Sequence, residues 1–207
     1  FGCAITTGFG VIENNAKLKM GESVVIYGSG GIGLNIIQAA NLHSAYPIIA
    51  VDIYENRLKT AKKVGATHLI NSSSEDPGKS IREILQKREL DVFIDNTGIP
   101  KFIELGYSCV HDHGIIVLLG GPRLGNNLNI YSWPLHFGKS LIGSHGGDIK
   151  PELDSPRYLN LIQKKKIKLK EIISDRYPLT DINVAINAMR EGKTSGRILI
   201  ELWVYLK

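Results

Sequence analysis

The chain carries, at residues 24–33, the stretch Val24-Val25-Ile26-Tyr27-Gly28-Ser29-Gly30-Gly31-Ile32-Gly33. The β-branched and aromatic residues predict a short buried strand, and the glycines after it fit the pattern G-x-G-x-x-G. In such a turn Gly28 takes the tight bend, Gly30 lets the backbone approach a pyrophosphate, and Gly33 lets the next helix pack closely on the strand. The helix N-terminus offers free N–H groups and a positive dipole end. The stretch therefore predicts a dinucleotide-binding turn, with a plain glycine turn as the alternative.

A carboxylate, Asp52, ends the next apolar run, about 20 residues beyond the turn. At that position a carboxylate accepts hydrogen bonds from the adenosine ribose hydroxyls and repels a 2′-phosphate. This favours NAD over NADP, although Arg57 is near enough in sequence to offset part of the repulsion. Asp52 can also act as the N-cap of the helix that follows, and the two roles are compatible.

Short apolar runs alternate with helical patterns from Ser23 onward, which is typical of a parallel sheet built from βαβ units. The predicted strands are residues 24–27, 48–51, 68–70, 91–94, 115–119 and 198–203, with a further edge strand at 140–143. The predicted helices are residues 6–19, 32–42, 55–64, 80–86, 102–109, 155–164 and 182–191. The pattern predicts an α/β fold with a doubly wound, six-stranded parallel sheet, the Rossmann dinucleotide-binding fold.

The composition excludes several other classes of protein. With 207 residues, 43% hydrophobic and 22% charged, the chain is large enough to bury its own core. Every apolar run is interrupted before the roughly 20 residues that a membrane span needs. The one tight basic run, Lys164-Lys165-Lys166, is typical of a solvated helix end and predicts no nucleic-acid partner. Cys3 and Cys109 lie far apart without C-x-x-C spacing, so we expect no disulfide framework and a cytoplasmic location.

Together these motifs give the chain a resemblance to the coenzyme-binding portion of the zinc-dependent medium-chain alcohol dehydrogenases, including the glutathione-dependent formaldehyde dehydrogenase branch. The resemblance covers nearly the whole chain. Its motifs are Gly2-Cys3-Ala4-Ile5-Thr6-Thr7-Gly8, the glycine turn, Val51-Asp52 with Arg57, Gly65-Ala66-Thr67, Gly120-Gly121-Pro122, Gly146-Gly147, and Gly192-Lys193 through Arg197. It implies an oxidoreductase in which a hydride passes from a primary alcohol or a hemithioacetal-like substrate to NAD.

The resemblance also assigns residues to the coenzyme. It places Thr7, Leu119, Gly120 and Gly121 at the nicotinamide, Ile53 and Arg57 around the adenosine, Asn96 and Thr97 on the flank, and Arg197 at the pyrophosphate. These join the turn residues Gly28, Ser29, Gly30, Gly31, Ile32 and Gly33, and the carboxylate of Asp52. The pair Asn96-Thr97 is more polar than the apolar pair usual in the family.

By the same resemblance Cys3 occupies the position of the third protein ligand of the catalytic zinc, whose Cys and His partners precede the coenzyme domain. A catalytic zinc needs about three protein ligands, so we expect zinc only in the full-length enzyme and assign no catalytic residue here. A small buried helix residue is the alternative for Cys3. The chain begins at Phe1 with neither an initiating Met nor a signal peptide, which indicates a fragment. We expect residues 1–22 to lead in from a missing catalytic domain and residues 23–207 to form the NAD-binding domain.

Other functions stay open. A zinc-free quinone or enoyl reductase of the same superfamily would make Cys3 incidental, and a nucleotide-sensing module would need no chemistry, although the match as far as Arg197 argues against a sensor. A methyltransferase commonly has G-x-G-x-G and less need of Gly33. The partners we expect are an alcohol or aldehyde substrate and, through residues 128–142, a second copy in a homodimer. The pair His111 and His113 is expected in an exposed turn rather than in a metal site.

Overall fold

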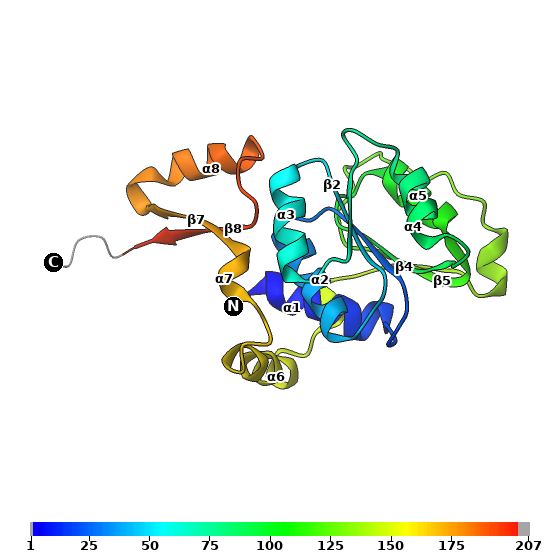
Figure 1. Cartoon of the computed structure of the whole chain (residues 1–207), viewed down its shortest axis with the longest axis horizontal. Helices are drawn as coiled ribbons and strands as arrows, with labels where there is room; N and C mark the ends of the chain where they lie inside the picture. The colour runs from blue at the N-terminus through cyan, green and yellow to red at the C-terminus, as the bar shows by residue number, and fades with distance from the viewer. Residues whose placement is uncertain (1, 203–207) are drawn as a thin grey trace.

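A six-stranded parallel sheet forms the centre of the molecule, in the order β3-β2-β1-β4-β5-β6 (Figure 1). The computed structural model describes residues 2–202. The strands are β1 (Val24–Tyr27), β2 (Ile48–Asp52), β3 (His68–Asn71), β4 (Leu90–Asp95), β5 (Val110–Leu118) and β6 (Ser140–Gly143). The strand order reverses between β1 and β4, as in a doubly wound sheet. The predicted fold class is therefore confirmed.

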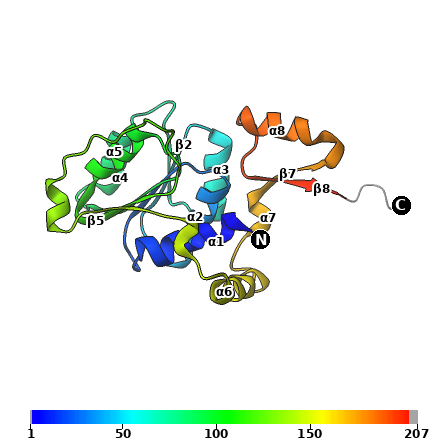
Figure 2. The ribbon, with the colours of Figure 1, turned by 180° about the vertical axis from the view of Figure 1, so that it is seen from behind.

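Helices cover both faces of this sheet (Figure 2). They are α1 (Cys3–Gly10) with its π-helical extension η1 (Val11–Ala16), α2 (Gly31–Leu42), α3 (Glu55–Val64) and α6 (Pro151–Gln163) on one side, and α4 (Pro77–Leu85) and α5 (Pro100–Cys109) on the other. Successive strand residues alternate between the two faces. In β1, Val24 and Ile26 pack under α2, whereas Val25 and Tyr27 pack under α4 and α5. Because both faces are covered, the central strands β1 and β2 are buried along their whole length.

The carboxyl-terminal part forms a small lobe beside the sheet (Figure 1). After α7 (Leu169–Ile172), strand β7 (Ile173–Pro178) pairs in parallel with β8 (Arg197–Glu201), and α8 (Ile182–Arg190) connects them. The prediction that the last strand completes the main sheet is wrong, because β6 already occupies that edge. The alternating exposure of β8 suits a sheet covered on one side. Trp203, the predicted end of that strand, lies outside the described residues.

Two smaller predictions also need correction. The first helix begins at Cys3 and ends at Ala16, where Lys17 adopts a left-handed conformation with φ 48°. His111 and His113 lie on β5 rather than in a turn. There the Nε2 atom of His111 is 3.3 Å from Oδ1 of Asp91, a carboxylate that parallel strand pairing brings close although it is distant in sequence.

None of the described helices combines the length and the apolar character that a bilayer crossing requires.

Candidate functional site

The glycine turn joins β1 to α2 at the carboxyl edge of the sheet. Gly28 has φ 99°, a left-handed conformation that favours glycine. A Cβ atom on Gly33 would overlap the carbonyl oxygen of Gly28, so helix and turn pack as closely as their backbones allow. A Cβ on Gly30 would meet nothing within 4 Å. The turn thus has one tight bend, one close contact and one open position, the arrangement that a pyrophosphate-binding turn requires.

The first turn of α2 directly follows the open position at Gly30. Gly30 is its N-cap residue and makes no side-chain capping bond, so the first amide groups are free to bind an anion. The Oγ atom of Ser29 is buried and has no hydrogen-bond partner within residues 2–202. A buried polar atom without a partner is unusual, and here it lies in the turn that a phosphate would occupy.

Asp52 is fixed beside the turn by backbone groups. Its Oδ2 accepts a hydrogen bond from the N–H of Ser29 at 2.8 Å, and its Oδ1 accepts one from the N–H of Tyr54 at 3.0 Å. Only 5% of Asp52 is exposed. The expected N-cap role is wrong, because α3 begins at Glu55 and its N-cap residue is Tyr54. The carboxylate instead ties the loop after β2 to the turn after β1.

Arg57, near the start of α3, contacts three groups of the protein. Its Nη1 is 3.7 Å from Oδ2 of Asp52, and its guanidinium lies 4.6 Å from the centre of the Tyr54 ring. Its Nε donates to the carbonyl oxygen of Thr194 at 3.5 Å. The side chain of Ile53 is 50% exposed at the same end of β2. Arg57 is therefore already engaged by the protein.

The loop after β4 contacts the turn. The Nδ2 atom of Asn96 donates to the carbonyl oxygen of Gly28 at 3.3 Å. The fully buried carboxylate of Asp95 accepts bonds from the N–H and hydroxyl groups of Thr97 and from the N–H of Gly98. Burial raises the pKa of Asp95, while these bonds favour its charged form. Asp95 thus holds the Asn96–Gly98 loop in place.

The loop after β5 packs against that loop. The N–H of Leu119 donates to the carbonyl oxygen of Asp95 at 2.9 Å. Gly120 lies so close to Thr97 and Gly98 that a side chain would overlap their backbone. The structure thus places Leu119, Gly120 and Gly121 beside the Asn96–Gly98 loop. Thr7 is buried on α1, where its backbone faces Gly147, so its place beside the nicotinamide stays a prediction.

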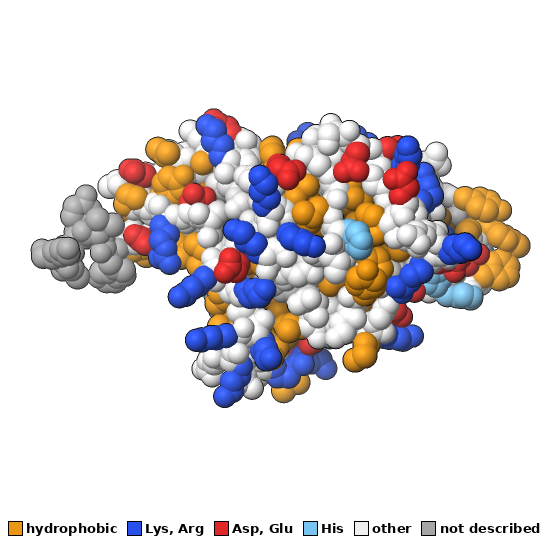
Figure 3. Space-filling model, in the orientation of Figure 1, with side chains coloured by type: hydrophobic (Ala, Val, Ile, Leu, Met, Phe, Trp, Pro, Cys, Tyr) orange, Lys and Arg blue, Asp and Glu red, His pale blue; other side chains and the backbone are white. Residues whose placement is uncertain are grey.

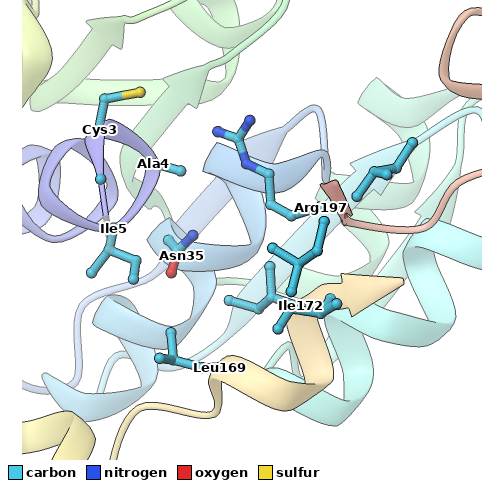
Figure 4. Close-up of a pocket in the computed structure, with 11 residues that line it drawn as sticks. Cys3, Ala4, Ile5, Asn35, Leu169, Ile172 and Arg197 are labelled. Carbon is cyan, nitrogen blue, oxygen red and sulfur yellow. The ribbon is translucent and has the colours of Figure 1, made fainter. Parts of the chain in front are cut away.

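Arg197 reaches the turn from the carboxyl-terminal lobe. A Cβ on Gly31 would overlap the Nε atom of Arg197, so the arginine lies directly against the start of α2. With Cys3 and Asn35, Arg197 lines a cavity of about 340 Å³ (Figure 4). The sequence analysis missed Asn35, whose buried Oδ1 atom has no partner within residues 2–202. Its position four residues after Gly31, one helical turn into α2, is the signal that could have found it.

Cys3 is exposed at this cavity, so the view of it as a small buried residue is wrong. Within residues 2–202 no three His, Cys, Asp or Glu side chains gather closely enough to hold a metal ion. A protein zinc site needs about three protein ligands. The described residues therefore do not fit zinc by themselves.

Comparison with known proteins gives the family. Residues 31–164 match the family model described as zinc-binding dehydrogenase. The chain belongs to this family. It is 34% identical over 198 residues to alcohol dehydrogenase 2 of Oryza sativa subsp. japonica, a match that covers 93% of the chain and 51% of the relative. The chain thus spans about half the length of the curated relatives it matches.

Solved structures of the family agree with this assignment. Benzyl alcohol dehydrogenase from Acinetobacter calcoaceticus is 34% identical with a TM-score of 0.88, over 97% of this chain and 55% of that one. An alcohol dehydrogenase zinc-binding domain protein from Burkholderia ambifaria is 31% identical with a TM-score of 0.89, over 97% and 54%. The predicted resemblance is confirmed: the chain is the coenzyme-binding portion of a zinc-dependent medium-chain alcohol dehydrogenase family member.

Proposed function

We propose that the chain binds NAD at the carboxyl edge of its sheet and forms the coenzyme-binding part of a dehydrogenase that oxidises a primary alcohol or a hemithioacetal-like substrate. The observation that carries the proposal is the bond between the Asp52 carboxylate and the Ser29 amide, because it couples a ribose-binding carboxylate to a pyrophosphate-binding turn. When bound, NAD supplies a nicotinamide ring that accepts a hydride. The residues of the chain bind and orient the coenzyme.

Each part of NAD has residues that suit it. The open position at Gly30, the free amides of α2 and the exposed guanidinium of Arg197 suit the pyrophosphate. The carboxylate of Asp52 suits the adenosine ribose, with Ile53 as an apolar surface beside it. The remaining predicted residues are Asn96 and Thr97 on the flank of the coenzyme, and Thr7, Leu119, Gly120 and Gly121 at the nicotinamide.

The surroundings of Asp52 favour NAD over NADP. Two backbone N–H groups, those of Ser29 and Tyr54, donate to its carboxylate and fix its position. Arg57 is engaged by Asp52, Tyr54 and Thr194, so it does not neutralise the charge of an added 2′-phosphate. A 2′-phosphate at this position would lie against a buried carboxylate that backbone bonds hold in place.

We expect Asp52→Asn to weaken NAD binding about tenfold or more, the effect of losing a charge-assisted hydrogen bond, and to narrow the difference between NAD and NADP. Titration calorimetry with both coenzymes measures this. Asp112→Asn is the matched control, since Asp112 is exposed on β5 away from the carboxyl edge. Unchanged NAD affinity in Asp52→Asn, or tighter binding of NADP than of NAD to the unaltered chain, would contradict the assignment.

The chemistry of the whole enzyme extends the proposal. Residues 1–22 would lead in from a catalytic domain outside this chain, and residues 23–207 would form the NAD-binding domain, with Cys3 as one zinc ligand among others from the catalytic domain. Metal analysis and NAD reduction by alcohols, measured on the full-length protein, test this. Full activity without zinc would reject the zinc-dependent reaction and favour a zinc-free reductase. Cys3 and Cys109 are free thiols, which fits the cytoplasmic location we propose.

A homodimer is part of the same proposal. Residues 128–142 expose four large apolar side chains, those of Tyr131, Trp133, Leu135 and Phe137. Hydrophobic side chains gather at the end of the molecule that holds this segment (Figure 3). The edge strand β6 lies next to it and pairs only with β5 among the described strands. Light scattering at micromolar concentration tests the dimer, and a monomeric mass would reject it.

A further inference from the structure

The loop at residues 192–196, which returns from α8 to β8, lies against the segment that follows β2. We name residues 192–196 the return loop. The Nδ2 atom of Asn56 donates to the carbonyl oxygens of Gly192 and Lys193, at 3.3 and 3.2 Å. These bonds connect parts of the chain that are 136 and 137 residues apart. They attach the carboxyl-terminal lobe to the adenosine side of the coenzyme site.

The packing around these bonds is tight. Gly192 has φ 69°, and a Cβ atom on it would overlap the ring of Tyr54. Thr194 is only 3% exposed, and its carbonyl oxygen accepts the bond from Arg57. The return loop is therefore enclosed by Tyr54, Asn56 and Arg57.

The return loop leads directly to Arg197. Gly196 packs against the carbonyl group of Ile172, and Arg197 then begins β8 with its side chain against Gly31. Strand β8 pairs only with β7 among the described strands, so the main sheet does not hold it. None of the ion pairs among residues 2–202 includes Arg197. Its backbone pairs with Ile173 of β7, and the return loop is the segment that joins it to Tyr54, Asn56 and Arg57.

We propose that Tyr54 and Asn56 are positioning residues that hold the return loop so that Arg197 lies over the pyrophosphate-binding turn. The inference rests on the proposed NAD site and goes beyond it, because neither side chain contacts the coenzyme in that proposal. It makes phosphate binding depend on the junction of β2 and α3, since Asp52 ends β2 and Asn56 lies in the first turn of α3. In this proposal the segment from Asp52 to Asn56 serves two parts of NAD. Asp52 binds the adenosine ribose, and Tyr54 and Asn56 hold the return loop that places Arg197 at the pyrophosphate.

The test measures calorimetric affinities for NAD and for ADP, which carries the pyrophosphate and the adenosine but no nicotinamide. We expect Arg197→Gln to weaken both about tenfold, the loss of one charge-assisted contact. We expect Asn56→Ala to weaken both about threefold to tenfold. If Asn56 acts through Arg197, adding Asn56→Ala to Arg197→Gln causes little further loss. Both single variants should also show affinities that depend less on salt, because salt screens the Arg197–phosphate contact.

Two further variants separate positioning from general damage. Gly192→Ala disturbs the return loop from the other side, through the Tyr54 ring, and should repeat the effect of Asn56→Ala without altering Asp52 or Arg57. Asn14→Ala is the matched control, because Asn14 also bonds to two loop carbonyl groups, those of Gly147 and Asp148. It should lower the melting temperature and leave ADP affinity unchanged.

The outcomes are distinct for the two proposals. If the unaltered chain binds neither NAD nor ADP, the proposed function fails. If it binds both and Arg197→Gln weakens them, but Asn56→Ala has no effect or an effect that adds fully to that of Arg197→Gln, the positioning role is rejected. An equal loss of ADP affinity in Asn14→Ala would also reject it.

Discussion

Gly33→Val is expected to lower the melting temperature of the chain by about 5–10 °C and to remove measurable NAD binding. A side chain at this position overlaps the carbonyl oxygen of Gly28, which is backbone and has little freedom to move. Overpacking of this kind costs about 1–3 kcal/mol, and each kcal/mol lowers the melting temperature of a domain of this size by about 2–4 °C. The turn must also shift away from α2, which separates the free amides from the open position at Gly30.

Thermal melting followed by circular dichroism, with and without NAD, measures both effects. Gly143→Val is the matched control, because a Cβ on Gly143 meets nothing within 4 Å and β6 lies three places from β1 in the strand order. It should leave the melting temperature nearly unchanged. If the Gly33→Val chain had the same melting temperature and NAD affinity as the unaltered chain, the close contact between turn and helix would be unimportant.

Gly30→Val is expected to preserve the fold, unlike Gly33→Val, and to lower the NAD affinity about 100-fold, equivalent to about 2.7 kcal/mol. Gly30 has φ −74° and ψ −168°, which a β-branched residue adopts easily. Its side chain would project into open space in the structure. That space is where the proposal puts the pyrophosphate, so the valine would exclude the coenzyme without disturbing the protein.

Melting temperature and calorimetric affinity together test this. The NAD affinity of a Gly30→Ala chain should lie between those of the unaltered chain and Gly30→Val, since a single methyl group fills less of the same space. If Gly30→Val bound NAD as tightly as the unaltered chain, the pyrophosphate could not lie against Gly30. If the variant unfolded, the position would not be open as described.

The sequence predicted the parts of this fold that depend on local pattern. Strands β1 and β2, and the second half of β5, contain short apolar runs because helices bury both faces of the sheet. The turn and Asp52 were predictable because their chemistry fixes residue types at a short spacing. Strand β7 escaped prediction, because Ser174, Asp175 and Arg176 interrupt any apolar run and its partner β8 lies beyond a helix.

The rest of the candidate site depends on contacts that no local pattern shows. Asn56 and Gly192 are 136 residues apart in the chain, and their bond follows from how the carboxyl-terminal lobe returns to the sheet. The pairing of His111 with Asp91 has the same origin, since strand register alone brings them together. Asn35 was missed because the cavity that it lines with Cys3 and Arg197 is formed by three elements that are distant in sequence.

The most direct test of the NAD site is to record the backbone amide chemical shifts of the chain with and without saturating NAD. We predict that the changes concentrate at residues 28–33, 52–57, 96–97, 119–121 and 192–197, along the carboxyl edge of the sheet. Residues around a second cavity, lined by Arg82, Cys109 and Lys139, should not change. No shift changes at saturating NAD, or changes confined to that second cavity, would contradict the account.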